Sequence, residues 1–291
     1  MHKYLKSIGF SEYNTTLLNR TLKNEVMQNP NRKEMFQAEE ENYFCFEKDY
    51  GECFGLCVIK AGETEENSEI VAFYPYVRGY NYLYNEKFDI DPFSDGEGFY
   101  GYCDDSNIGI PMIFFINNPV DFRSTRKYLE GEENLNCVTL SGLASDGVVL
   151  LPIEQNESQK KKERRENEKR LDMINQAKSG SVEAMEALTI QDMSQYTCVN
   201  IRSKKEDIFS IVSSYFMPHT VECDKYAVLG DITDVVTMIN KKTKEEVYYL
   251  SLKCNGIDFE VMINKKDMMG VPAKGLRWKG HLWMQGQMDC L

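Results

Sequence analysis

The chain has 291 residues, of which 42% are hydrophobic and 27% charged, a composition typical of a soluble protein with room for one large or two modest domains. No apolar run approaches the length of a membrane span and the N-terminus lacks a secretory signal, so we expect a cytoplasmic protein with no membrane contact. Residues 1–150 contain 13 Lys and Arg but 25 Asp and Glu, which accounts for the whole net charge of −12 and argues against nucleic-acid binding by this half.

The first 40 residues are predicted to be helical. The clearest pattern lies in residues 17–28, where Leu18, Leu22 and Val26 recur at a spacing of four residues and Leu17 adjoins Leu18. Side chains at this spacing share one side of a helix. We therefore expect an apolar face that covers a sheet.

Strand patterns follow this helix. Residues 43–50 alternate, residues 54–62 are apolar up to a glycine, and residues 68–77 are β-branched and aromatic. Residues 109–122 contain a dense apolar run between prolines, which predicts a buried strand. Residues 136–153 are predicted to form a hairpin, with the sequence SDG supplying its turn. Together these segments indicate an antiparallel sheet.

The character of the chain then changes. Residues 157–170 contain no apolar side chain and are rich in strong helix formers, which predicts a solvated helix that ends near Lys178. Ser181 is expected to cap a short second helix, residues 181–188. Ser203 begins a capping box, which predicts a third helix that runs to Pro218.

From Lys225 onward the chain contains four or five short, evenly spaced strand patterns, which favour a small OB-like or SH3-like β-barrel. The predicted fold class is therefore α+β in three parts. Residues 1–155 form an N-terminal antiparallel sheet with helices, residues 156–220 a helical connector, and residues 221–291 a C-terminal β-domain.

The common catalytic signatures are absent from the sequence. It has no phosphate-binding glycine loop, no H-E-x-x-H zinc motif and no nucleophile elbow. The nine cysteines are irregularly spaced, so we expect reduced thiols that pack in the core. The acidic residues 88–105 do not fit the EF-hand spacing. We predict no catalytic residue, no metal and no cofactor. A cysteine paired with His219 or His281 is kept as an alternative, for example His281 with Cys254 or Cys290.

Aromatic residues are concentrated in one part of the N-terminal half. From Phe73 to Tyr102, 11 of 30 residues are Phe or Tyr. Tyr80, Tyr82 and Tyr84 alternate and would share one face of a strand. Tyrosine is common both in cores and at binding surfaces. We therefore consider this face either packed core or the surface for a protein or small-molecule partner.

The last strand pattern, residues 276–288, holds both tryptophans of the chain. Its alternation predicts a core face made of Leu276, Trp278, Gly280, Leu282 and Met284. The opposite face would carry Arg277, Lys279, His281 and Trp283. A basic and aromatic face is typical of OB-like modules that bind single-stranded nucleic acid. The alternative is an ordinary half-buried strand whose polar side meets water.

Three phrases resemble a known protein family. They are MHKYLKSIGF at the start, EDIFSIVSSYFMPHTVECDKYAVLGDI from residue 206, and CNGIDFEVMINKKDMMGVPAKGLRWKGHLWMQG from residue 254. The family is domain of unknown function 3881, associated with Gram-positive anaerobes, and the resemblance spans nearly the whole chain. It implies a bacterial, cytoplasmic protein and implies no activity, cofactor or site residue.

These observations favour a non-enzymatic binding or regulatory protein that recognises a protein or a small ligand. Single-stranded nucleic-acid binding through the C-terminal barrel is the first alternative. An enzyme with a cysteine and histidine site is the second.

Overall fold

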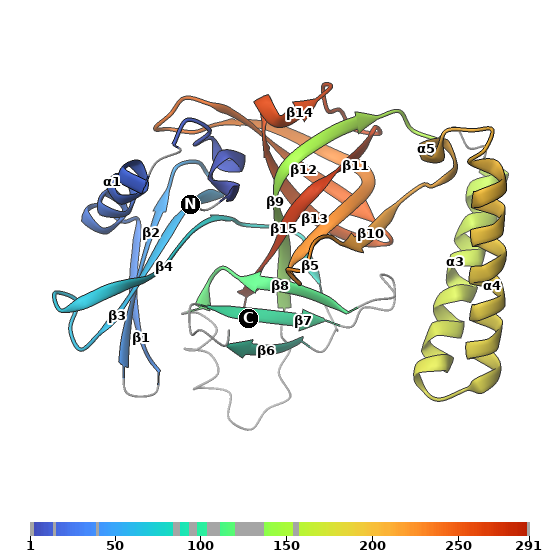
Figure 1. Cartoon of the computed structure of the whole chain (residues 1–291), viewed down its shortest axis with the longest axis horizontal. Coiled ribbons are helices and arrows are strands. Elements are labelled where there is room, and N and C mark those ends of the chain that lie inside the picture. The colour runs from blue at the N-terminus through green and yellow to red at the C-terminus, as the bar shows by residue number, and fades with distance from the viewer. Residues whose placement is uncertain are drawn as a thin grey trace.

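An antiparallel sheet of four strands forms the N-terminal part of the molecule (Figure 1). The computed structural model describes residues 3–13, 16–38, 41–83, 88–92, 98–103, 111–119, 137–153 and 157–289. In spatial order the sheet contains β1 (Arg32–Ala38), β2 (Glu41–Asp49), β3 (Phe54–Gly62) and β4 (Ser68–Val77). The last three strands confirm the predicted strand patterns.

Helix α1 (Thr16–Gln28) packs on β2 and β3, and Leu22 and Val26 of its predicted apolar face are completely buried. The prediction of helix throughout the first 40 residues is wrong on both sides of α1. A 3-10 helix, η1 (Lys3–Ile8), precedes it, and β1 follows it. Residues 32–38 form a strand rather than a helix because they pair with β2. This pairing buries Phe36 against the ring of Tyr43 at a centroid distance of 4.9 Å.

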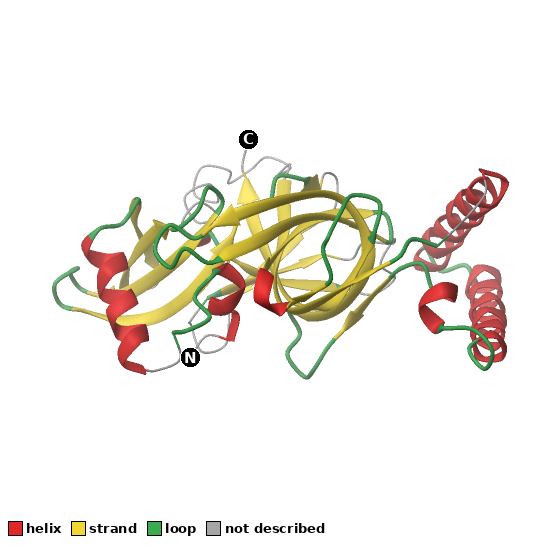
Figure 2. Cartoon of the chain, turned by 90° about the horizontal axis from the view of Figure 1, so that it is seen from above, coloured by secondary structure: helices red, strands yellow, loops and turns green. Residues whose placement is uncertain are grey.

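A closed barrel of five strands lies at the centre of the molecule (Figures 1 and 2). Its strands are β9 (Cys137–Leu150), β11 (Lys225–Ile239), β12 (Glu246–Cys254), β13 (Ile257–Asn264) and β15 (Arg277–Asp289). The barrel closes because β15 pairs antiparallel with both β9 and β11, while β9 and β13 pair in parallel. The predicted β-barrel is thus present.

The predicted hairpin at residues 136–153 is wrong, because β9 is one continuous strand. Its long antiparallel partner β15 keeps the SDG segment extended and accommodates it as a register shift opposite His281 and Leu282. Gly147 is needed there, since a Cβ atom would lie 2.4 Å from Nε1 of Trp278. One barrel strand therefore comes from the segment that we assigned to the N-terminal domain.

Two separate hydrophobic cores lie on the two sides of the barrel wall. The first fills the barrel interior and contains Trp278, Leu282 and Met284, which confirms the predicted core face. The second lies between the wall, η1, α1 and the N-terminal sheet, and contains Trp283. Alternation along β15 thus places the two tryptophans in different cores.

Shorter strands extend the barrel sheet. They are β5 (Tyr82–Leu83), β6 (Phe88–Pro92), β7 (Phe99–Cys103), β8 (Met112–Ile116), β10 (Tyr215–Pro218) and β14 (Met268–Met269). Strand β8 pairs with β15, and β7 and β6 continue from it. Met112, Phe114 and Ile116 are completely buried, which confirms the predicted buried strand.

Two antiparallel helices, α3 (Glu157–Lys178) and α4 (Val182–Arg202), form an arm that projects from the barrel (Figures 1 and 2). Gly180 has a φ of 97° in the turn between them, and Ser181 Oγ accepts the amide proton of Ala184. The predicted end of α3 and cap of α4 are confirmed. No helix in the described ranges is long and apolar enough to cross a membrane.

The third predicted helix, residues 203–218, is largely wrong. Helix α4 runs on to Arg202, and only α5 (Ile208–Ile211) follows it, capped by Asp207 rather than Ser203. The chain then enters β10, where Tyr215 pairs with Leu229 of β11. An available strand partner on the barrel outweighs the local helical pattern.

Buried polar contacts connect the N-terminal sheet to the barrel. Gln285 of β15 is completely buried, accepts the amide proton of Val77 at 3.1 Å and donates to the carbonyl of Pro75 at 2.9 Å. Ser141 of β9 donates to the carbonyl of Val77 at 2.8 Å. The end of β4 is therefore fixed to the barrel wall by side chains that have no access to water.

Replacing Gln285 with alanine tests this connection. The Gln285→Ala change leaves the amide of Val77 and the carbonyl of Pro75 without this partner, and we expect it to lower the free energy of unfolding by about 2–3 kcal/mol. Urea unfolding followed by tryptophan fluorescence measures the change. An unaltered unfolding curve would show that the connection contributes nothing to stability.

Candidate functional site

The three tyrosines predicted to form a binding surface have different positions. Tyr80 lies in the connection after β4 and is 60% exposed, with its ring edge-on to Tyr249 at 6.0 Å. Tyr82 begins β5, opposite Thr139 of β9. Tyr84 lies outside the described residues. The structure therefore shows one exposed tyrosine side chain here, and the shared face remains a prediction.

A buried carboxylate holds the segment that carries Tyr80. Glu260 of β13 is 1% exposed and accepts the amide proton of Tyr80 at 3.1 Å, together with a short bond from the side chain of Asn81. Burial raises the pKa of Glu260, and the bonds from Tyr80 and Asn81 oppose that shift. The backbone at Gly79 passes close to this carboxylate. The backbone that carries Tyr80 is therefore held in place by Glu260, while the Tyr80 side chain is exposed.

The second predicted surface, on β15, is not an exposed face. Arg277 and Trp283 are each only 5% exposed, while Lys279 and His281 are partly exposed. A nucleic-acid face would need all four side chains to be exposed, and Arg277 and Trp283 are not. Other elements cover these two side chains. Helix α5 lies over Arg277 at one end of β15, and η1 lies over Trp283 nearer the other end.

Trp283 is part of the outer core. Its ring stacks on Tyr4 of η1 at 5.6 Å and lies 5.0 Å from Phe115 of β8. Its Nε1 donates to Oδ2 of Asp224 at 2.6 Å. Burial raises the pKa of Asp224, and the bond from Trp283 partly offsets this shift.

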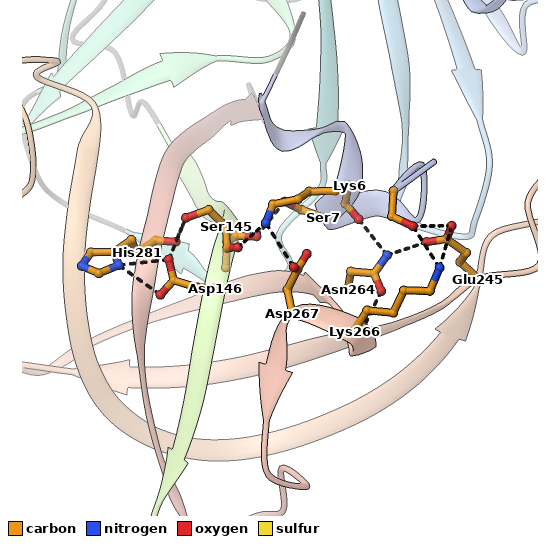
Figure 3. A network of polar contacts seen from close by, with 11 residues as sticks. Lys6, Ser7, Ser145, Asp146, Glu245, Asn264, Lys266, Asp267 and His281 are labelled. Carbon is orange, nitrogen blue, oxygen red and sulfur yellow. Dashed lines mark hydrogen bonds and ion pairs between the residues drawn. The ribbon is translucent and has the colours of Figure 1, made fainter. Parts of the chain in front are cut away.

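His281 takes part in a polar network at the junction of η1 and the barrel (Figure 3). Its Nδ1 lies 3.0 Å from both carboxylate oxygens of Asp146, and its ring stacks on His219 at 4.1 Å. Lys6 donates to the carbonyl of Ser145 at 2.7 Å and forms an ion pair with Asp267 at 3.1 Å. These contacts attach η1 to β9 and to the segment after β13.

The cysteine alternatives for His281 gain no support from this geometry. The thiol of Cys254 is buried, bonds to the carbonyls of Tyr215 and Leu229, and has a pKa that burial raises to about 12. A thiol with a raised pKa is a poor nucleophile. Cys290 lies outside the described residues.

Arg277 fixes the base of the helical arm. Its guanidinium donates to the carbonyls of Leu151 at 2.9 Å, Phe209 at 2.6 Å, Val212 at 2.9 Å and Ser213 at 3.5 Å. Leu151 precedes α3, and the other three lie in or just after α5. One buried side chain therefore binds the chain where it enters the arm and where it returns.

Lys279, two residues along β15, strengthens the same contact. Its ammonium group lies 4.3 Å from the ring centroid of Phe209 in α5, within the range of a cation–π interaction. Burial lowers the pKa of Arg277, and Asp231 and Asp207 oppose that shift. The basic residues of β15 thus interact with the chain itself.

Helix α4 carries an apolar face with no cover in the described structure. The face contains large side chains that are between 46% and 71% exposed: Val182, Met185, Ile190, Met193, Tyr196 and Ile201. Spacings of three and five residues keep them on one side of the helix. We call this set the α4 face.

The opposite side of α4 packs on α3. Ala184 is buried there, Leu188 and Val199 are partly buried, and Arg170 of α3 forms a 2.8 Å ion pair with Asp192. Helix α4 is therefore apolar on two sides, and α3 covers only one. The apolar spacing along this helix is visible in the sequence. Our prediction missed it because it placed the helix only at residues 181–188, whereas α4 continues to Arg202.

Comparison with models of known protein families shows the family to which this chain belongs. The model of domain of unknown function 3881, described from E. rectale, matches residues 5–286. The chain belongs to this family. No curated protein and no solved structure matches the chain. The family's description gives no activity or ligand, so chemical roles in this member must come from its own residues.

Removing the Arg277 contact is expected to free the base of the arm. Arg277→Ala leaves four carbonyl groups without their donor, and we expect a loss of about 2–4 kcal/mol in the free energy of unfolding. Hydrogen exchange at residues 208–214 should accelerate while β12 stays protected. Lys279→Ala is the milder comparison, at roughly 0.5–1 kcal/mol. Equal exchange in Arg277→Ala and the unaltered protein would contradict this role.

Asp224 makes stability depend on pH. The pKa of Asp224 is higher in the folded than in the unfolded protein, so its protonated form stabilises the fold. This contribution to the free energy of unfolding is fully present at low pH and is lost as pH rises through the folded pKa. Asp224→Asn can keep the bond from Trp283 without the buried charge. We expect the variant to gain stability relative to the unaltered protein as pH rises above about 4, the pKa of an unfolded aspartate. Urea midpoints measured at a series of pH values on both sides of this point test it, and parallel curves would refute it.

Proposed function

We propose that this protein is a non-enzymatic binding protein that docks another protein chain through the α4 face. The exposure of six large apolar side chains on one side of one helix supports this proposal most directly. The barrel and the N-terminal sheet serve as a rigid base, to which Arg277 fixes the arm. The arm then presents α4 clear of the rest of the molecule (Figure 2).

The energetic reason lies in the helical hairpin itself. A helix gains most of its stability by burying an apolar face, and two helices alone cannot cover both apolar sides of α4. Each exposed side chain of this size leaves roughly 1–2 kcal/mol of burial unrealised. A contiguous apolar surface on a soluble protein commonly marks an interaction site.

Other parts of the earlier predictions fit this proposal. Tyr80 offers a smaller, additional contact for a partner, from its base on Glu260. The free thiols among the described cysteines support the cytoplasmic setting that we expect for a bacterial protein of this family. An OB-like or SH3-like barrel, as part of a two-domain layout, would serve as scaffold in this scheme. Nucleic-acid binding is less well supported, because Arg277 and Trp283 are buried.

Affinity capture with matched variants tests the proposal. Tagged full-length protein, Met193→Ser/Tyr196→Ser and the control Ala187→Ser/Gln195→Ser are each incubated in lysate of the bacterium that encodes the protein. All four positions are exposed, but only Met193 and Tyr196 belong to the α4 face. We expect the first variant to lose at least ~10-fold of the protein captured by the other two. The same captured proteins at the same yield in all three samples would refute the proposal.

A further inference from the structure

We propose that the occupant of the α4 face is the α4 face of a second copy, placed antiparallel across a two-fold axis. This inference rests on the proposed function and names the partner. The arms of two copies would form a layer of four helices in the order α3, α4, α4 and α3. The interface would be isologous, with the same residues contributed by both copies.

The order of the exposed side chains is nearly the same when read in either direction. An axis near residues 191 and 192 places Ile190 against Met193 of the second copy, and Val182 against Ile201 of the second copy. Met185 then lies within one turn of Tyr196 of the second copy. Each large apolar residue thus meets another, which a face shaped for an unrelated surface would not require.

The smaller polar residues on this side of α4 are prepared for burial. Thr189 and Thr197 donate their hydroxyl groups to the carbonyls of Met185 and Met193, each at 2.8 Å. Their methyl groups remain available for packing, and no unpaired hydroxyl has to be desolvated. Glu186 and Asn200 are the exceptions, because both lie within the stripe and are exposed.

The helix dipoles also favour the antiparallel arrangement, because antiparallel pairing places the two α4 dipoles head to tail. The charged residues at the ends of α4 are bonded within each copy. Glu183 accepts a hydrogen bond from Ser181, and Arg202 forms an ion pair with Glu206.

The available area fits a reversible dimer. Six side chains with these exposed fractions offer on the order of 600 Å² per copy, somewhat less than the roughly 800 Å² per partner of a standard stable interface. We therefore expect association in the micromolar range rather than a permanent dimer. The arm stands clear of the barrel and the N-terminal sheet, so two arms can approach each other (Figures 1 and 2).

Sedimentation velocity of the full-length protein tests self-association. From about 1 to 100 µM the unaltered protein should shift from monomer to dimer. Ile190→Glu/Met193→Glu places four charges at the two-fold axis and should weaken the dimer at least ~100-fold. The control Ala187→Glu/Ser194→Glu adds the same charge to exposed positions outside the α4 face and should stay within about 3-fold. Circular dichroism establishes that each variant keeps its helices.

Two further variants make the test specific. Glu186→Gln removes the charge within the stripe and should tighten the dimer by about 3–10-fold. In a background with the exposed Cys198 and Cys223 changed to serine, a short bifunctional maleimide should join Val182→Cys of one copy to Ile201→Cys of another. Crosslinks between two Val182→Cys copies would indicate a parallel contact and overturn the proposal.

A purely monomeric protein at 100 µM would also overturn it. That result would leave the proposed function standing, provided that Met193→Ser/Tyr196→Ser still loses a captured protein from lysate. Loss of capture together with monomeric behaviour identifies a foreign partner. Equal capture by all variants would remove the proposed function itself, whatever the oligomeric state.

Discussion

The pairing of β15 with both β9 and β11 is the interaction on which the rest of this structure depends. It closes the barrel, and it brings together strands that are separated in the chain by the whole helical arm. Because successive side chains of a strand point to opposite sides, β15 also supplies residues to both cores. Trp278 fills the barrel, and Trp283 packs under η1. The N-terminal sheet, η1 and the arm are all attached to side chains of this one strand.

The buried guanidinium group of Arg277 fixes the position of the helical arm on the barrel. Arg277 is surrounded by main-chain carbonyl groups from both ends of the arm's connection to the barrel. Four hydrogen bonds from the three nitrogens of one planar guanidinium group hold these segments together more specifically than a lysine could. A helical arm with a fixed base can present its outer face at a defined angle. That is the arrangement expected of an element whose role is to meet another molecule.

The α4 face leaves a large apolar surface exposed to water in the described structure. Helix α4 is apolar on two sides. One side packs on α3 and stabilises the hairpin, and the other is the surface that we propose to dock a partner. Self-association covers this surface without any additional component. The threonine hydroxyl groups that bond within α4 are consistent with burial of that side. The N-terminal sheet and the barrel remain accessible in such a dimer, with Tyr80 as an exposed contact.

The sequence by itself determined the local structure wherever one pattern dominated. Alternation identified β2 and the core side of β15, apolar and β-branched runs identified β3 and β4, and the cap at Ser181 identified the start of α4. Only the tertiary structure decided that the SDG segment stays extended, because its partner strand comes from more than a hundred residues later. It likewise decided that Arg277 and Trp283 are buried, since η1 and α5 come from distant parts of the chain. Alternation shows which side chains share a side of a strand, but what covers that side depends on contacts that no local pattern contains.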